Sequence, residues 1–259
     1  MTLGAWRYFG RMRILVTLLS LICGIAHADT VHVAVASNFA EPAKVIADLF
    51  EEETGHEVIL SFGSSGKLYA QIVNGAPFDV FLSADIEKPL RLFEAGLSGE
   101  PFTYAVGRLV LWQKNSSTTA VMQLTHGNYN KLAIANPKAA PYGLAALETL
   151  ETMKTRQMID REGMTPFSEV LVIGENIAQA FQFVDSGNAE LGFVALSQLS
   201  IVNDMQGGST WIVPQDYHSP ITQDAVRIND TVASNAFITF LQSEPIRDLI
   251  SNSGYEVLK

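Results

Sequence analysis

Val33-Ala-Val-Ala-Ser37-Asn38 and Ile59-Leu-Ser-Phe-Gly63-Ser64-Ser65-Gly66 are two stretches in which a run suited to a β-strand ends at small hydroxyl or amide residues. The pattern of an amphipathic helix follows each of them at once. A strand that passes into a helix through Ser, Asn and Gly exposes unpaired backbone N–H groups beside hydroxyl donors. Two such turns facing one another would hold an anion with neutral donors only. Taken alone, either turn is equally well explained as a simple helix N-cap.

The alternation of strand and helix continues along the chain. A short buried strand is predicted at 80–83 and a helix at 86–95, and the rhythm returns with strands at 132–135, 170–173 and 191–195. Such alternation is typical of parallel sheets that are covered by helices on both faces. No flexible linker divides the sequence, so we expect an α/β protein with two lobes between which the chain crosses by strands.

Residues 1–28 have the composition of a cleaved signal peptide. Basic residues precede an apolar run at 14–25, and Ala26-His27-Ala28 supplies a cleavage site of the A-x-A type. The run is short for a membrane span, so we expect export to the periplasm. The single cysteine, Cys23, lies inside this segment. Lipidation of Cys23 is the second interpretation, which the bulky Ile22 before it disfavours.

Removal of this leader makes the chain strongly acidic. It takes away three of the 17 basic residues and none of the 27 acidic ones, which leaves a net charge of about −13. A surface of this charge disfavours nucleic acid and anionic lipid as partners. The remaining chain contains no cysteine, which excludes disulfide bonds and thiol catalysis.

Two further turns join a predicted strand to a predicted helix. Asn136-Pro-Lys-Ala-Ala-Pro-Tyr142-Gly143 follows the strand at 132–135, and Gly174-Glu-Asn-Ile177 follows the strand at 170–173. A proline-stiffened connection and a capped turn are their simplest explanations. Ligands of open parallel sheets, however, bind beyond the carboxyl ends of the strands. All four turns are therefore candidate binding elements.

Motifs of catalysis and metal binding are incomplete in this sequence. Ser64-Ser-Gly-Lys67 fits the S-x-x-K pattern, but no S-D-N or K-T-G partner accompanies it. The histidines show no metal-ligand spacing, and no acid, base and nucleophile converge. We therefore expect neither an enzyme nor a bound cofactor. A secreted hydrolase that uses Ser65 and Lys67 is the alternative from another class.

Together these segments resemble the periplasmic molybdate-binding proteins of ABC importers. The resemblance follows the family's order over essentially the whole mature chain, and its most specific stretch is Gly75-Ala-Pro-Phe-Asp-Val-Phe-Leu-Ser-Ala-Asp85. It implies a two-lobed periplasmic-binding-protein fold of type II, in which each lobe is a mostly parallel sheet flanked by helices. We predict lobe I at 29–105 plus 217–259 and lobe II at 106–216, with an oxyanion in the cleft between them.

The resemblance also implies which residues bind the oxyanion, one group from each of the four turns. They are Ser37 with Asn38 as an additional donor, Ser65, Tyr142 through its backbone N–H, and Ile177. In some members a tyrosine after the Leu-Gly-x-Val strand adds its hydroxyl. This chain has Ala195 at that position, so one expected donor is missing and Asn38 is the candidate to replace it.

The resemblance predicts a monomeric receptor that captures molybdate or tungstate and delivers it to the membrane permease of an ABC importer. A hydrogen bond to a charged group contributes about 1.5–3 kcal/mol, so several neutral donors suffice to hold a dianion. A cage of donors alone rejects a protonated oxyanion such as hydrogen phosphate, whose O–H finds no acceptor. A sulfate or phosphate receptor, and a sensor domain without a transporter, are the remaining alternatives.

Overall fold

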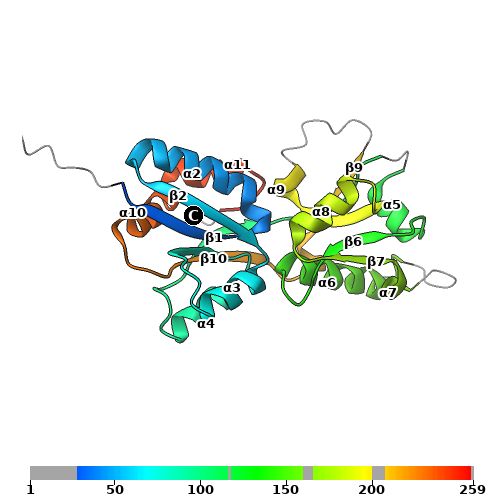
Figure 1. The fold of residues 1–259 in the computed structure, drawn as a ribbon. Helices are drawn as coiled ribbons and strands as arrows, with labels where there is room; N and C mark the ends of the chain where they lie inside the picture. Colours follow the sequence, from blue (N-terminus) through cyan, green and yellow to red (C-terminus); the bar gives the residue numbers. More distant parts are fainter. Residues whose placement is uncertain (1–27, 116–117, 160–165, 200–207, 258–259) are drawn as a thin grey trace, which may run out of the picture.

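The computed structural model describes residues 28–115, 118–159, 166–199 and 208–257. Two five-stranded sheets lie side by side, and each has helices on both faces (Figure 1). We call lobe I the part built on the sheet β2-β1-β3-β10-β4, and lobe II the part built on the sheet β7-β6-β8-β5-β9. The predicted two-lobed α/β fold is confirmed. The predicted signal peptide, apart from Ala28, lies outside the described residues.

Lobe I has a mostly parallel sheet. Strand β1 pairs in parallel with β2 and β3, whereas β10 runs antiparallel to both of its neighbours. Its strands are β1 (Thr30–Ala36), β2 (Glu57–Gly63), β3 (Val80–Leu82), β4 (Phe102–Gly107) and β10 (Ile221–Arg227). Its helices are η1 (Ser37–Phe39), α2 (Ala40–Thr54), α3 (Ser65–Val73), α4 (Glu87–Glu94), α10 (Val232–Leu241) and α11 (Glu244–Asn252).

Lobe II repeats this arrangement. Strand β6 is parallel to β7 and β8, and β5 is antiparallel to β8 and β9. Its strands are β5 (Leu109–Gln113), β6 (Leu132–Ala135), β7 (Leu171–Gly174), β8 (Leu191–Ala195) and β9 (Ser209–Ile212). Its helices are α5 (Ala120–Thr125), α6 (Pro141–Thr155), α7 (Phe167–Val170), α8 (Ile177–Asp185), α9 (Leu196–Leu199) and η2 (Gln215–Tyr217).

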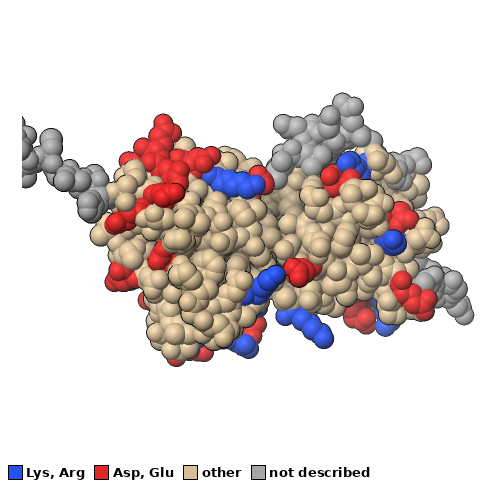
Figure 2. Space-filling view, viewed as in Figure 1, with Lys and Arg blue, Asp and Glu red and all other residues tan. Residues whose placement is uncertain are grey.

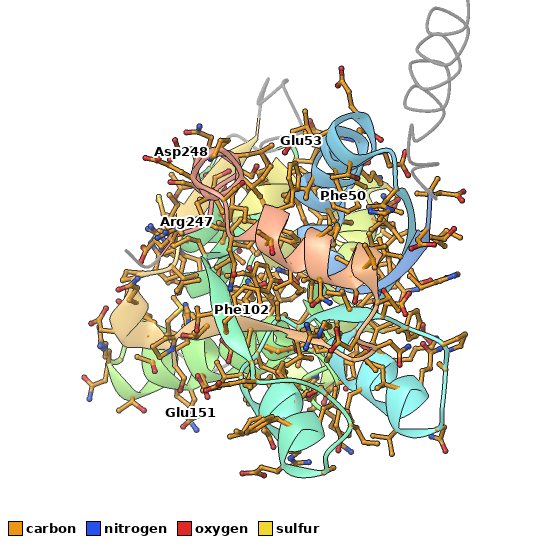
Figure 3. The ribbon with its side chains drawn as sticks, turned by 90° about the vertical axis from the view of Figure 1, so that its left-hand side faces the viewer. Phe50, Glu53, Phe102, Glu151, Arg247 and Asp248 are labelled. Atoms are coloured by element: carbon orange, nitrogen blue, oxygen red, sulfur yellow. The ribbon has the colours of Figure 1, made fainter. Side chains whose placement is uncertain are left out.

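Lobe I buries both faces of its sheet because successive strand residues point to opposite sides. Val33 and Val35 pack with α2, α10 and α11, whereas Ala34 between them packs with α3 and α4. Phe50 of α2 is fully buried and meets the rings of Phe237 and Phe240 edge-on, with ring centroids 5.3 and 5.5 Å apart. Figure 3 views the molecule from the side of lobe I and labels Phe50. The outer helices of lobe I are thus anchored to β1.

The chain crosses between the two sheets at two places. Only Arg108 separates β4 of lobe I from β5 of lobe II, and residues 213–220 with η2 connect β9 back to β10. The Arg108 side chain pairs with Glu256 at 2.8 Å, and its carbonyl oxygen accepts the N–H of Leu196. The first crossing is therefore short and held by contacts on both sides. The lobe boundaries at 105/106 and 216/217 stay a prediction.

Strand β10 carries a bulge between Gln223 and Asp224. Bulges redirect side chains next to functional sites, and here both residues are buried. The Thr103 hydroxyl donates to Asp224 Oδ1 at 2.6 Å. Burial nevertheless raises the pKa of Asp224, and the nearby Asp85 raises it further, so the ionised carboxylate lowers the stability of lobe I.

We expect Asp224→Asn to raise the Tm by roughly 2 °C at neutral pH, because the amide still accepts from Thr103 and carries no charge. Because folding raises the pKa of Asp224, its ionised carboxylate lowers the stability of the wild type at pH values above the folded-state pKa. This loss of stability disappears as the pH falls toward 3.8, the ordinary Asp pKa. Thermal unfolding between about pH 4 and pH 8 checks this. The control is Asp48→Asn, on the exposed side of α2. A gain in Tm that does not change with pH would contradict the explanation.

Candidate functional site between the two lobes

Two neighbouring parallel strands of lobe I end in register. Ala36, the last residue of β1, is paired with Gly63, the last residue of β2. Strand β1 passes directly into η1 and α2, and β2 passes into α3 through Ser64, whose side chain accepts the N–H of Lys67. The N-terminal N–H groups of a helix lack partners within the helix. The first two predicted turns therefore lie next to one another and present their donors at the same edge of the sheet.

Lobe II places its two turns in the same way. Ala135 at the end of β6 is paired with Gly174 at the end of β7, and the N–H of Asn136 donates to the Gly174 carbonyl at 2.7 Å. Helix α6 starts at Pro141, and α8 starts at Ile177 after Asn176, whose side chain accepts the N–H of Gln179. Tyr142 and Ile177 are thus first-turn residues of their helices, although Tyr142 was predicted in the turn that precedes the helix.

The turns of the two lobes face each other and touch. The N–H of Gly66 donates to the carbonyl of Ala139 at 3.0 Å, and Lys67 Nζ lies 3.5 Å from Glu175 Oε2. Ala36 of lobe I also belongs to the buried apolar cluster of lobe II. The five predicted binding residues are all buried at this junction: Ser37, Asn38, Ser65, Tyr142 and Ile177.

A cavity of about 300 Å³ lies between the lobes. Its walls come from the start of α2 in lobe I and from α8 and α9 in lobe II. They are formed by Ser37, Asn38, Ala40, Glu41, Ala178, Phe181, Gln182, Asp185, Ser197 and Gln198. Two of the predicted binding residues therefore line an interlobe cavity.

The hydroxyl of Ser65 is held in place by lobe I. It accepts the N–H of Ala84 at 2.9 Å, and Ser65 is only 1% exposed. A hydroxyl that accepts one hydrogen bond still has its own hydrogen to donate. Ser65 is therefore a fixed neutral donor at the start of α3, whereas Ser64 serves as the N-cap of that helix.

A buried cluster of polar side chains joins the two lobes beside these turns. Asn38 Nδ2 donates to Gln223 Oε1 at 2.9 Å and lies 3.1 Å from the hydroxyl of Tyr255. Gln223 Nε2 is 3.4 Å from the hydroxyl of Tyr142, which belongs to lobe II. Six residues form this cluster, which we call the interlobe polar cluster: Asn38, Tyr104, Tyr142, Ser197, Gln223 and Tyr255.

Burial keeps the tyrosines of this cluster uncharged. It raises the pKa of Tyr104, Tyr142 and Tyr255 above the ordinary tyrosine value, so each hydroxyl remains a donor at neutral pH. Gly107 makes room for the cluster, since a Cβ there would lie 2.2 Å from the Tyr142 hydroxyl. The last residue of β4 must therefore lack a side chain for the two lobes to meet.

Charged residues surround the junction: Glu41 and Asp185 line the interlobe cavity, and Lys67 pairs with Glu175 across the turns. Figure 2 shows acidic residues gathered over the outer part of lobe I, and basic residues beside the seam between the lobes. Within the described ranges, no three His, Cys, Asp or Glu side chains are grouped so that they could hold a metal ion. In the same ranges, no helix is both long and apolar enough to cross a membrane. The predicted binding residues buried at this junction, in contrast, carry neutral hydrogen-bond donors.

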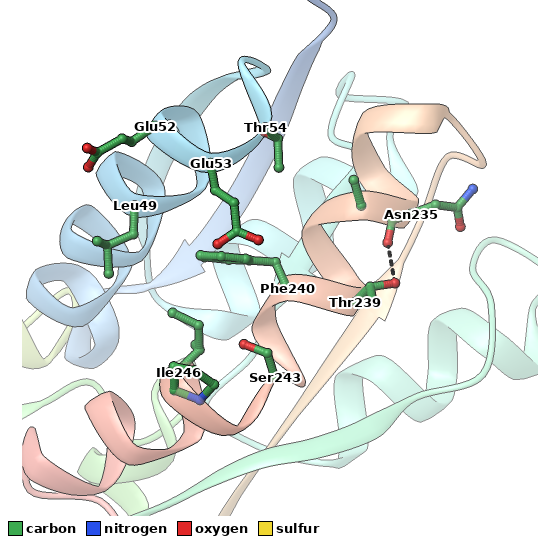
Figure 4. Close-up of a pocket in the computed structure, with 11 residues that line it drawn as sticks. Leu49, Glu52, Glu53, Thr54, Asn235, Thr239, Phe240, Ser243 and Ile246 are labelled. Atoms are coloured by element: carbon green, nitrogen blue, oxygen red, sulfur yellow. Dashed lines mark hydrogen bonds between the residues drawn. The ribbon is translucent and has the colours of Figure 1, made fainter.

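A larger cavity, of about 710 Å³, lies on lobe I between α2, α10 and α11 (Figure 4). Glu53 points toward the ring of Phe240 at its centre, and the Thr239 hydroxyl donates to the carbonyl of Asn235 at one side. None of the predicted binding residues lines it. Its lining combines apolar side chains with the carboxylates of Glu52 and Glu53 and includes none of the four turns, so the interlobe junction is the better candidate site.

Comparison with known proteins agrees with this geometry. The model of the bacterial extracellular solute-binding protein family matches residues 31–256. The chain belongs to this family. It is a family of solute-binding receptors, so the chain is not an enzyme, and the alternative of a hydrolase built on Ser65 and Lys67 is set aside.

Relatives within the solute-binding protein family include two molybdate-binding proteins ModA. The protein from Rhodobacter capsulatus is 43% identical, over 92% of this chain and 94% of its own length. The protein from Azotobacter vinelandii is 45% identical, over 95% of this chain and 98% of its own length. A solved structure, the periplasmic molybdate-binding protein of Azotobacter vinelandii, matches with a TM-score of 0.79 and 35% identity, over 88% of this chain and 100% of that one. The resemblance inferred from the sequence motifs is confirmed.

Ala195 stands where the resemblance led us to expect a tyrosine donor. It is fully buried, and its N–H donates to Gln198 Oε1 at 2.9 Å. Gln198 Nε2 in turn donates to the carbonyl of Ile177 at 3.3 Å. The side chain of Gln198 therefore ties the end of β8 to the start of α8. The sequence patterns did not indicate Gln198, because a glutamine in a short helix has no distinctive signal.

The two lobes approach each other closely at Gly66. An added Cβ would lie 3.1 Å from the Cα of Ala139 and 3.2 Å from its carbonyl oxygen. We expect Gly66→Ala to hold the lobes apart and increase the radius of gyration in small-angle X-ray scattering, while better helix propensity maintains the Tm.

The control for this substitution is Gly99→Ala, whose added methyl would meet the Arg227 carbonyl at an ordinary 3.7 Å within lobe I. Equal radii of gyration for the two variants would contradict the assigned role of Gly66.

Proposed function

We propose that this chain captures molybdate, and tungstate with it, at the junction of the lobes and delivers the anion to the permease of an ABC importer from the periplasm. The observation that carries the proposal is the meeting of four strand-to-helix turns whose donors are all neutral. Membership of the solute-binding protein family, and relatives at 43–45% identity that are molybdate-binding proteins, support the same ligand.

Each turn would contribute a donor to the anion. The Ser37 and Ser65 hydroxyls, together with the backbone N–H groups of the predicted binding residues, would supply the set; the N–H groups of Gly66 and Lys67 are already donated to Ala139 and Ser64. The backbone N–H of Tyr142 fits this role better than its hydroxyl, which lies in the interlobe polar cluster. Ile177 can contribute only through its backbone, because its side chain is apolar.

Asn38 would contribute through its backbone N–H. Both hydrogens of its side-chain amide have partners within lobe I, since Nδ2 donates to Gln223 at 2.9 Å and to Tyr255 at 3.1 Å. An NH₂ group has two hydrogens to donate. The side chain of Asn38 therefore holds the shape of the turn. Backbone N–H groups would then replace the tyrosine hydroxyl that is missing at Ala195.

Neutral donors also determine the selectivity we propose. A fully ionised dianion can accept from every donor, whereas the O–H of hydrogen phosphate would face donors only and lose a hydrogen bond on burial. The absence of a buried countercharge avoids its desolvation penalty. Sulfate has the same charge as molybdate and tungstate but is smaller, so a fixed cage built for the larger anions would leave it with long hydrogen bonds.

Calorimetric titration with molybdate, tungstate, sulfate and phosphate tests the proposal. We expect one molecule of molybdate or tungstate to bind per chain, and phosphate not to compete. Molybdate at about 100 times its Kd should stabilise the protein by about 2.7 kcal/mol, which raises the Tm by roughly 5–10 °C for a protein of this size. Binding of sulfate but not of molybdate would overturn the proposal in favour of a sulfate receptor.

Ser65→Ala tests the direct role of one hydroxyl. Loss of a hydrogen bond to a charged ligand should weaken molybdate binding by about 1.5–3 kcal/mol, which is roughly 10- to 150-fold in Kd. The matched control is Ser64→Ala, which removes the N-cap of the same helix and should lower stability by about 1 kcal/mol with little change in Kd. If the two variants weaken binding equally, Ser65 acts as a structural residue and not as a ligand.

A further inference from the structure

The last described residues of the chain lie across the junction between the lobes. Glu256 forms an isolated bridge with Val106 of β4, through backbone hydrogen bonds of 2.7 and 2.9 Å. Its carboxylate also pairs with Arg108, the residue between β4 and β5. On the other side, Gly254 approaches the backbone of Ser197 in lobe II. Tyr255 is therefore held between the two lobes by both of its neighbours.

The hydroxyl of Tyr255 contacts both lobes at once. It lies 2.7 Å from the carbonyl oxygen of Asn38, 3.1 Å from Asn38 Nδ2 and 2.9 Å from the hydroxyl of Ser197. Ser197 Oγ donates to the same Asn38 carbonyl at 2.9 Å. One hydroxyl thus fixes the backbone and the side chain of the Asn38 turn, and joins that turn to α9 of lobe II.

We propose that Tyr255 is a positioning residue of the anion site, which couples the order of the Ser37–Asn38 turn to closure of the lobes. The inference rests on the proposed function only for the identity of the anion. When the lobes are together, Tyr255 and Ser197 both bond to Asn38. When they separate, the Ser197 contacts with Asn38 and Tyr255 break, because Ser197 belongs to lobe II. An anion held by the turn and by lobe II therefore dissociates more slowly while these contacts are intact.

Tyr104 provides a matched control for Tyr255. Both tyrosines are 4% exposed, and both meet the ring of Phe39 edge-on, with centroids 4.9 and 5.3 Å away. The Tyr104 hydroxyl, however, bonds to Ser83 and Gln223, which both belong to lobe I. Replacement of either tyrosine by phenylalanine keeps the packing and removes one buried hydroxyl, but only Tyr255→Phe removes a contact between the lobes.

Stopped-flow measurement of molybdate binding gives the first test. We expect Tyr255→Phe to raise the dissociation rate about 10-fold, equivalent to about 1.4 kcal/mol, with little change in the association rate. Tyr104→Phe should change the dissociation rate less than about 3-fold, which is within about 0.65 kcal/mol. Ser197→Ala should raise the dissociation rate by a smaller factor in the Tyr255→Phe variant than in the wild type, because the two hydroxyls act on the same carbonyl. Equal rates for the two phenylalanine variants would overturn the inference.

Amide hydrogen exchange of the ligand-free protein gives a second test that does not require an anion. Tyr255 and Asn38 both belong to lobe I, so Tyr255→Phe should speed exchange in peptides covering residues 37–40 about 10-fold more than Tyr104→Phe does. Unchanged protection in Tyr255→Phe would overturn the inference whatever the ligand. If the wild type fails to bind molybdate while this difference in exchange is present, the proposed function fails and the role of Tyr255 stands.

Discussion

The structure depends on the registry of neighbouring parallel strands. In each lobe two adjacent strands end at paired residues, Ala36 with Gly63 and Ala135 with Gly174, and each passes into a helix within a few residues. The pairing of the sheet fixes where these helices begin, so their unpaired N–H groups collect at one edge. A site made of backbone donors needs this precision, because a backbone group cannot change rotamer to reach its ligand.

The charged groups of the site lie at its rim and the neutral groups lie inside. Lys67 and Glu175 come from turns of different lobes, yet their side chains are 58% and 71% exposed. An ion pair this exposed contributes little to stability. The buried interior instead uses tyrosine, glutamine, asparagine and serine, whose hydrogen bonds are satisfied within the cluster. In the proposed site, a lysine buried beside the anion would add a desolvation penalty.

The parts of the fold that follow from local pattern could be predicted from the sequence. Ser64, Gly66 and Asn176 mark strand ends and helix caps by their own chemistry, and the buried strands follow from their apolar runs. Helix α6 begins at Pro141, inside the stretch predicted as a turn, because proline suits the first turn of a helix. Strand β4 was not predicted, and its partner strand β10 lies far along the chain, so no local pattern specifies the pairing. The contact between Asn38 and Tyr255 spans 217 positions, and no local signal in the sequence specifies such a pair.

The single residue between β4 and β5 has a mechanical consequence. Arg108 is the one residue that joins β4 to β5 in the first crossing. A rotation of one sheet against the other would therefore use a few backbone torsions at Arg108 and those of the second crossing at 213–220. Gly107, beside that pivot, already touches the interlobe polar cluster. In such a rotation, points near the pivot would move little, and Lys67 and Glu175 at the rim would move further. The part of the interlobe polar cluster beside Gly107 would therefore stay aligned while the turns at the rim separate.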